Sequence, residues 1–179
     1  VDTLGSSATT DVTVGAHQLH LRDTPVRSAI ACTECHVVPA TVDAPGHIDA
    51  SPAEVTFGPL ASNNASPGWD RGSATCSGVY CHGATMAAPP LLDPTWTFAT
   101  EPDPGRPAAC AVCHGDPPPL PHAQVPACWN CHPETVDTGG AILIAGGRHI
   151  DGTLQPSTLT CTTCHGDAQT QNPAPPRST

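Results

Sequence analysis

The tightest constraint on this sequence is a unit of two cysteines and a histidine that recurs along it. The stretch from Cys110 to His132 reads CAVCHGDPPPLPHAQVPACWNCH and holds two complete Cys-x-x-Cys-His units. Positions i, i+3 and i+4 share one face of a helical turn, so the two thiols and the imidazole of each unit point in one direction. The thiols then reach the two vinyl groups of one haem, while the imidazole reaches its iron. Cys-x-x-Cys-His therefore predicts a site of c-type haem attachment.

All ten cysteines of the chain belong to five such units, and a histidine directly follows each pair. Four units have two residues between the cysteines, and the second unit along the chain has four. The predicted attachment cysteines and their proximal histidines are Cys32, Cys35 and His36; Cys76, Cys81 and His82; Cys110, Cys113 and His114; Cys128, Cys131 and His132; and Cys161, Cys164 and His165. The sequence therefore predicts five covalently bound haem c groups, each with its iron.

Disulfides and zinc are the alternative uses of paired cysteines. An even number of cysteines is found in the disulfide frameworks of secreted proteins, and Cys-x-x-Cys pairs also hold structural zinc. Disulfides leave the five following histidines unexplained. Zinc needs no histidine directly after each pair, and an odd number of pairs does not combine into four-cysteine sites. Haem attachment accounts for every cysteine and for the histidine beside it.

The composition predicts an irregular fold. The 179 residues include 16 glycines and 22 prolines, and aromatic residues make up only 3%, which is far from ordinary globular composition. Such a chain should not build a conventional core from its own side chains. We therefore expect mostly irregular coil with short α-helices wrapped around a chain of haems, little or no β-sheet, and a largely unfolded apoprotein.

Charge and hydropathy exclude two kinds of partner. Six arginines, no lysine and 16 acidic residues give a formal net charge of −10, and haem propionates would make it more negative. This charge argues against nucleic acid as a partner. It leaves basic proteins or mineral surfaces open as partners. The longest apolar run, Ala141 to Ala145, is too short to span a membrane. Covalent haem attachment takes place outside the cytoplasm. We therefore expect export through the periplasm, with a signal peptide removed ahead of Val1.

The order of the motifs predicts one pentahaem unit over residues 1–179 that contains an internal repeat. Residues 32–83 and 128–166 share the order haem site, Thr-Val-Asp, Gly, His-Ile-Asp, haem site, Gly. An inserted haem site at 110–114 lies between the copies. It follows a linker at 84–107, which carries Trp96 and Phe98 as aromatic anchors that could pack on haem faces.

A short helix is predicted ahead of the first haem site. In the stretch GAHQLHL, His17, His20 and Leu21 fall at i, i+3 and i+4, so one helix face would carry both imidazoles. The sequence Asp23-Thr24-Pro25 would end this helix. Aligned by the repeat, the histidine pair takes the place of His122.

Ten histidines serve five proximal positions and leave five over. Five irons and five spare imidazoles predict that every iron binds two histidines, although which spare histidine serves which haem stays open. Met86, the only methionine and the only rival axial ligand, is then left to packing. Asp49 and Asp151 lie two residues after His47 and His149. These aspartates either orient the two imidazoles or are solvated. The spare histidines, predicted as distal iron ligands, are His17, His20, His47, His122 and His149.

Irons with two protein ligands have no open position for a substrate. The histidine count therefore argues for electron transfer and against an enzyme, and no catalytic residue is predicted. A compact chain of this length has a radius of gyration of about 16 Å, which brings five haems nearly edge to edge. The sequence thus predicts a continuous path for electrons.

The sequence resembles the multihaem c-type cytochromes of metal-reducing bacteria. The likeness covers His17 to Gly166 and rests on the mixture of a Cys-x4-Cys-His site, CSGVYCHG at 76–83, with Cys-x2-Cys-His sites, and on the His-x-x-His ahead of the first site. Within that group the chain is similar to the extracellular cytochromes that polymerise into filaments, called cytochrome nanowires. The resemblance implies a repeating subunit at the cell surface or outside the cell, in which His17 or His20 ligates a haem of the neighbouring subunit.

Two alternatives to the filament stay open. A discrete periplasmic or surface electron shuttle would carry the same cofactors, with every distal histidine supplied within one chain and with redox proteins or extracellular acceptors as partners. A multihaem reductase needs an open haem, where the well-known nitrite reductases have Cys-x-x-Cys-Lys. This chain has no lysine, which disfavours the reductase.

Overall fold

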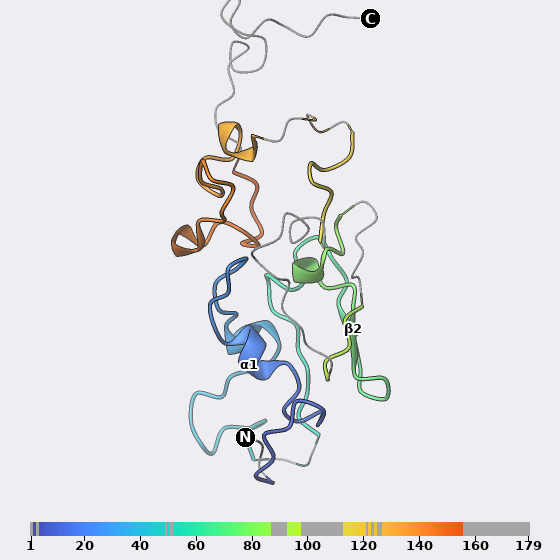
Figure 1. Ribbon diagram of the computed structural model, residues 1–179. Coiled ribbons are helices and arrows are strands. Elements are labelled where there is room, and N and C mark those ends of the chain that lie inside the picture. The colour runs from blue at the N-terminus through green and yellow to red at the C-terminus, as the bar shows by residue number, and fades with distance from the viewer. Residues whose placement is uncertain are drawn as a thin grey trace, which may run out of the picture.

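The computed structural model describes residues 2, 4–48, 50, 52–86, 93–97, 113–120, 122, 124 and 127–155, and these residues are mostly coil (Figure 1). One short α-helix, one two-stranded sheet and single 3-10 turns interrupt the coil. In chain order these elements are α1 (His17–His20), η1 (Cys32–Glu34), β1 (Gly68–Asp70), β2 (Thr75–Ser77), η2 (Tyr80–His82), η4 (Cys128–Asn130) and η5 (Ile144–Gly146). The predicted class, irregular with short helices and little β-sheet, is confirmed.

Helix α1 lies where the histidine spacing predicts it and ends ahead of Asp23-Thr24-Pro25. The amide of Leu21 donates to the carbonyl of His17 at 2.9 Å and closes the last turn. The guanidinium of Arg27 donates to the carbonyls of Leu19 at 2.7 Å and His20 at 3.3 Å. These carbonyls have no helical partner beyond the end of α1, and a cation is favourable there. Arg27 therefore holds the end of the helix that carries two candidate iron ligands.

The sheet is a hairpin in which β1 and β2 run antiparallel, with Trp69 opposite Cys76. A third segment, residues 93–97, joins the free side of β2 through a bridge between Thr75 and Thr95. The amide of Cys76 donates to the carbonyl of Pro94 at 3.2 Å. The hairpin therefore fixes the first cysteine of the second haem unit and brings part of the predicted linker against it.

The buried side chains of the described residues are small. Val14, Ala16, Ala61, Ala74 and Val79 form the apolar core, and within the described ranges no large side chain is fully buried. Deep burial of large aliphatic and aromatic groups normally supplies most of the favourable free energy of folding. The small core agrees with the expectation that this chain does not fold around its own side chains.

Residues 127–155 lie at one end of the molecule and the loop 37–48 lies at the other (Figure 1). The later segment is tied to the earlier part of the chain by specific hydrogen bonds. The hydroxyl of Ser28 donates to the carbonyl of Ile144 at 3.3 Å, and the amide group of Asn63 donates to the carbonyl of Gly152 at 2.8 Å. In the described part of the chain, no helix has the length and apolar character needed to cross a membrane.

Candidate haem sites

Two Cys-x-x-Cys-His units share one pattern of backbone hydrogen bonds. In the first, the amides of Cys35 and His36 both donate to the carbonyl of Cys32, at 3.1 and 2.9 Å. In the fourth, the amides of Cys131 and His132 donate to the carbonyl of Cys128 at the same two distances. Each unit is thus a single turn, η1 or η4, with hydrogen bonds back to the first cysteine. This is the geometry that the motif spacing predicts, because one turn puts both sulfurs and the ring on one side.

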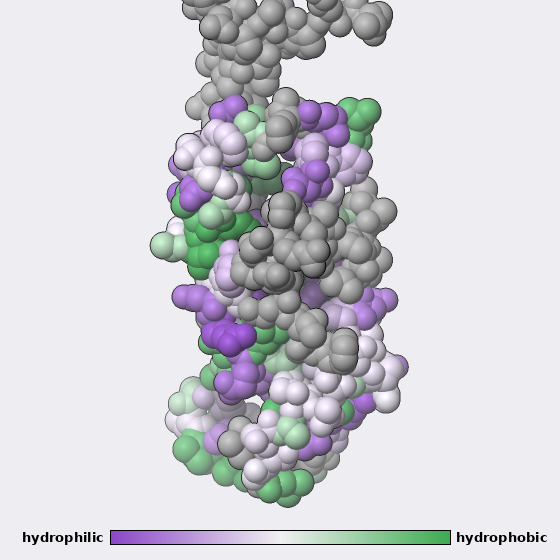
Figure 2. Space-filling view, in the orientation of Figure 1, coloured by the Kyte–Doolittle hydropathy of each residue, from purple (hydrophilic) through white to green (hydrophobic). Residues whose placement is uncertain are grey.

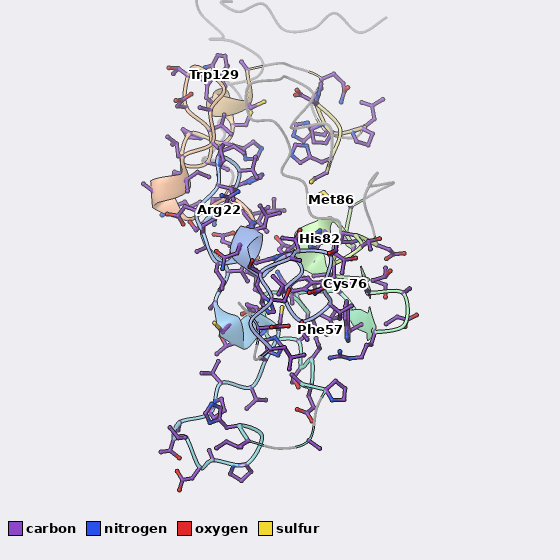
Figure 3. All side chains as sticks on the ribbon, turned by 60° about the horizontal axis from the view of Figure 1, so that its bottom comes forward. Arg22, Phe57, Cys76, His82, Met86 and Trp129 are labelled. Atoms are coloured by element: carbon purple, nitrogen blue, oxygen red, sulfur yellow. The ribbon has the colours of Figure 1, made fainter. Side chains whose placement is uncertain are left out.

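The second unit spans two elements instead of one turn. Cys76 lies in β2, and Cys81 and His82 lie in η2, as Figure 3 shows for the labelled Cys76 and His82. The connection passes through Gly78, whose φ is 59°, and a Cβ there would lie 2.5 Å from the carbonyl oxygen of Ser66. Only glycine fits this approach without strain. The two extra residues of this unit therefore make a strand-to-turn corner.

No disulfide joins Cys32, Cys35, Cys76, Cys81 and Cys131 within the part of the chain that the structure describes. Burial raises the pKa of both Cys76 and Cys81 to about 11. A thiol in such surroundings favours its neutral form, whereas zinc binds the thiolate. A thioether carries no charge, so these positions suit haem attachment better than zinc.

Eight of the nine described histidines form four pairs of neighbouring rings, at interplanar angles from 11° to 74°. Each pair joins one proximal histidine to one spare histidine, and no pair joins two of the same kind. The separations of the ring centroids are 6.2 Å for His17 and His36, 6.1 Å for His20 and His82, 6.5 Å for His114 and His149, and 6.3 Å for His122 and His132.

These separations fit one metal ion between two rings. Metal–imidazole bonds are about 2.0 Å long, and a five-membered ring with bonds of about 1.3 Å places each nitrogen about 1.1 Å from the centroid. Two rings on opposite sides of one metal ion then have centroids about 6.2 Å apart. Two imidazoles in direct van der Waals contact would lie closer when stacked. The four pairs therefore have the spacing of axial ligands on a haem iron.

The protonation of the rings also suits metal binding. In six histidines Nδ1 faces a backbone carbonyl, and a carbonyl only accepts hydrogen bonds, so Nδ1 carries the proton and Nε2 keeps its lone pair. Ligating histidines commonly donate their other ring nitrogen in this way. The donor histidines and acceptor residues are His17 to Val14, His20 to Ala16, His36 to Glu54, His47 to Val42, His114 to Gly115, and His149 to Val26.

Backbone carbonyls accept hydrogen bonds from Nδ1 of both repeat histidines, His47 and His149. The carboxylate of Asp151 instead accepts from the amide of Thr153 at 2.9 Å and from the side chain of Gln155. The alternative that Asp151 orients His149 is therefore wrong, because the ring turns toward Val26 in the earlier part of the chain. Asp49, its counterpart after His47, lies outside the described residues.

Burial keeps the central rings neutral. It lowers the pKa of His82 to about 4, with His20 and Arg27 adding to the effect. Burial also lowers the pKa of His20 and of His149. A neutral imidazole is the form that binds metal, so these rings are ready to serve as ligands without losing a proton.

The arrangement changes one expectation about His17 and His20. The resemblance to filament-forming cytochromes implied that one of them ligates a haem of a neighbouring subunit. Both rings instead face proximal histidines of their own chain, His36 and His82. The reason is local, because His17 and His20 lie one turn apart in α1 and each ring lies near a proximal histidine.

His47 is the one described histidine for which no second ring lies at this spacing. It is exposed, and its Nδ1 donates to the carbonyl of Val42 at 2.7 Å.

Met86 is 45% exposed, so it does not pack as expected; Figure 3 shows it on the segment that follows His82. Several predicted site residues lie outside the described part of the chain: Cys110, Cys161, Cys164 and His165.

Sequence reasoning missed what two residues do at the sites. Glu34, inside the first haem unit, accepts hydrogen bonds from the amides of Leu60 and Ala61, both at 2.9 Å. Trp96 was expected as an anchor on a haem face, but its indole contacts the rings of His17 and His20. The available signals were an acidic residue between the cysteines and a tryptophan in a linker. Neither signal indicates which residues the side chain contacts.

A family model described as the Geobacter CxxxxCH...CXXCH motif matches residues 75–114. The match joins the second and third haem units across the linker. A search of curated proteins and a search of solved structures each found no significant match. The matched motif indicates a multihaem c-type cytochrome of the Geobacter type, and with it covalent haem c and a role in electron transfer.

Proposed function

We propose that this protein is a pentahaem electron carrier in which every iron is held between two histidines. The observation that carries the proposal is the set of four imidazole pairs, whose centroids lie 6.1 to 6.5 Å apart. Each pair takes one histidine from a cysteine unit and one from elsewhere in the chain. Bound haem supplies a one-electron couple at the iron.

The residues of the chain set the conditions for that couple. Two imidazoles per iron leave no position for a substrate, which favours electron transfer over catalysis. Carbonyl acceptors at Nδ1 hold the rings in place and raise their basicity as ligands. Burial of His20, His82 and His149 lowers the local dielectric and thereby tunes the potential.

The internal repeat extends the ligand assignment to His47. In each copy the spare histidine upstream serves the first haem of that copy: His17 pairs with His36, and His122 pairs with His132. In the second copy, the His-Ile-Asp histidine, His149, serves the haem that precedes the copy. By the same rule His47 serves a haem that precedes the first copy.

One haem site of the sequence is left for His47, the site at His165. We propose that His47 of one subunit binds the iron at His165 of the preceding subunit, so that whole chains join head to tail. A head-to-tail contact of this kind generates a filament when its rotation does not close into a ring. The proposal keeps the filament and moves the crossing ligand from α1 to His47.

The surroundings of His47 support a protein contact. Four large apolar side chains of the loop 37–48 are exposed, with exposed fractions of 70% for Val37, 53% for Val38, 69% for Val42 and 77% for Ile48. Hydrophobic atoms gather at this end of the molecule in Figure 2. Large apolar side chains that are exposed together on one loop favour an interaction site there. A second copy bound at His47 would cover them.

Electron microscopy of the native holoprotein tests the filament. Long uniform fibres are expected from the wild type, and discrete particles with five haems per chain are expected from His47→Ala. Met86→Leu is the matched control and should still form fibres. Discrete wild-type particles at every concentration would leave a soluble shuttle as the function. A haem assay that returns fewer than five haems per chain would contradict the pentahaem proposal. Under the filament proposal the protein works at the cell surface or beyond it.

A further inference from the structure

Trp96 is held in place by residues just ahead of the second haem unit and just ahead of α1. Its backbone amide donates to the carbonyl of Ala74 at 2.7 Å. The neighbouring residue Thr95 bridges to Thr75 in β2. The indole Nε1 donates to the carbonyl of Val12 at 2.9 Å, just ahead of α1. The side chain is thus fixed at both its backbone and its ring, between the hairpin and the helix.

The indole touches the distal imidazoles of two different pairs. Its ring lies edge-on to His17, with centroids 4.8 Å apart and an interplanar angle of 89°. It lies 5.5 Å from His20 at an interplanar angle of 30°. T-shaped and tilted contacts at these distances are the favourable arrangements of aromatic rings. One side chain therefore restrains two rings that face two different proximal histidines.

Gly15 leaves the space that the indole fills. A Cβ built on Gly15 would overlap the five-membered ring of Trp96. The φ of Gly15 is 42°, a conformation that favours glycine. The backbone ahead of α1 is therefore shaped to receive this side chain against the helix.

We propose that Trp96 is a positioning residue that fixes the imidazole planes of His17 and His20. This inference rests on the proposed two-histidine ligation. A ligating ring is free to turn about its metal–nitrogen bond unless a neighbour stops it, and the carbonyl contact at Nδ1 is one restraint. The indole supplies a second restraint on both rings at once. The two pairs now have interplanar angles of 27° and 57°.

The angle between two axial imidazole planes governs the electronic anisotropy of a low-spin ferric iron. Electron paramagnetic resonance (EPR) of the oxidised holoprotein therefore reads out the role directly. The signals of the two haems are assigned as those lost in His17→Ala and His20→Ala. Trp96→Leu is expected to shift or broaden these two signals and to leave the other three unchanged.

Trp129→Phe is the matched control, because Trp129 lies in η4 of another haem unit (Figure 3). It should leave the two signals in place. Trp96→Phe keeps an aromatic ring but loses the hydrogen bond to Val12, so an intermediate shift of the same two signals is expected. If Trp96→Leu does not accumulate as holoprotein, Trp96→Phe decides.

Unchanged signals in Trp96→Leu, or in Trp96→Phe where only that variant folds, would overturn the positioning role. An equal change at all five haems would overturn it as well, because Trp96 would then act on the whole fold. A wild-type spectrum dominated by high-spin iron would instead refute the two-histidine ligation. The two failures are therefore distinguishable in one experiment.

Discussion

Replacing His149 by alanine should open the iron at His114 and no other. The His149 ring faces His114 with centroids 6.5 Å apart, and its Nδ1 is held by the carbonyl of Val26. Alanine has no group that reaches the metal. In the reduced protein, carbon monoxide should then bind at the vacated position, since it needs one open site on ferrous haem.

The expected amplitude follows from the site count. One of the five predicted haems should react, so His149→Ala should take up one carbon monoxide per chain more than the wild type under the same conditions. His122→Ala should also add one, because its ring faces a different proximal histidine, His132. The double variant should add two. Met86→Leu should add none.

The variant should still fold. Loss of the Val26 contact removes one hydrogen bond, worth about 1 kcal/mol. Loss of the iron bond opens the one loop between His114 and His149, worth about 4 kcal/mol, and leaves the other haem loops closed. The Ser28–Ile144 and Asn63–Gly152 hydrogen bonds still join the two parts of the chain. Uptake is measured by optical titration of the reduced holoprotein. No additional uptake by His149→Ala would refute the pairing with His114, and a double variant that adds only one would mean that both histidines serve one iron.

Three further predictions concern stability. Glu34→Ala removes the acceptor of two amides and should lower the free energy of unfolding by about 2 kcal/mol in denaturant titrations. The control Glu134→Ala breaks an exposed ion pair with Arg148 and should lower it by less than about 1 kcal/mol. Equal losses in the two variants would contradict the role of Glu34. Gly15→Ala should cost about 3 kcal/mol in the same assay, since strain and overlap with an indole add. Gly5→Ala, where φ is also positive but the space is open, should cost about 1 kcal/mol. Apoprotein made without haem attachment should have a radius of gyration near the unfolded value of about 45 Å by small-angle scattering, and a value near about 16 Å would refute a haem-dependent fold.

Local features of this fold were predictable from the sequence. The spacing of His17 and His20 gave α1, and the Cys-x-x-Cys-His spacing gave the turns η1 and η4. The excess of glycine and proline over aromatic residues gave the irregular class. Each of these depends on neighbours in the chain, so periodicity and composition carry the information.

The pairing of the rings was not predictable, because it depends on contacts between distant segments. His149 faces His114 while its Nδ1 donates to Val26, more than a hundred residues away in sequence. Trp96 lies in a stretch whose composition marks a linker, and its target is set by hydrogen bonds to Ala74 and Val12. No periodicity encodes such contacts, and the histidine count alone fixes only how many pairs to expect.

The proposed ligation also explains how a chain with so small a core holds one conformation. Each haem attached at a cysteine unit and bound by a distant histidine closes a loop, as a disulfide does. The longest such loop in the described part of the chain runs from His20 to His82. Closing a loop of about 60 residues costs the unfolded chain about 4 kcal/mol of conformational entropy at 25 °C. Several interlocking loops then replace the stabilisation that buried side chains give other proteins. The ligands that define the electron path are therefore also the cross-links that define the fold, and removing one histidine should loosen the two segments it joins as well as open one iron.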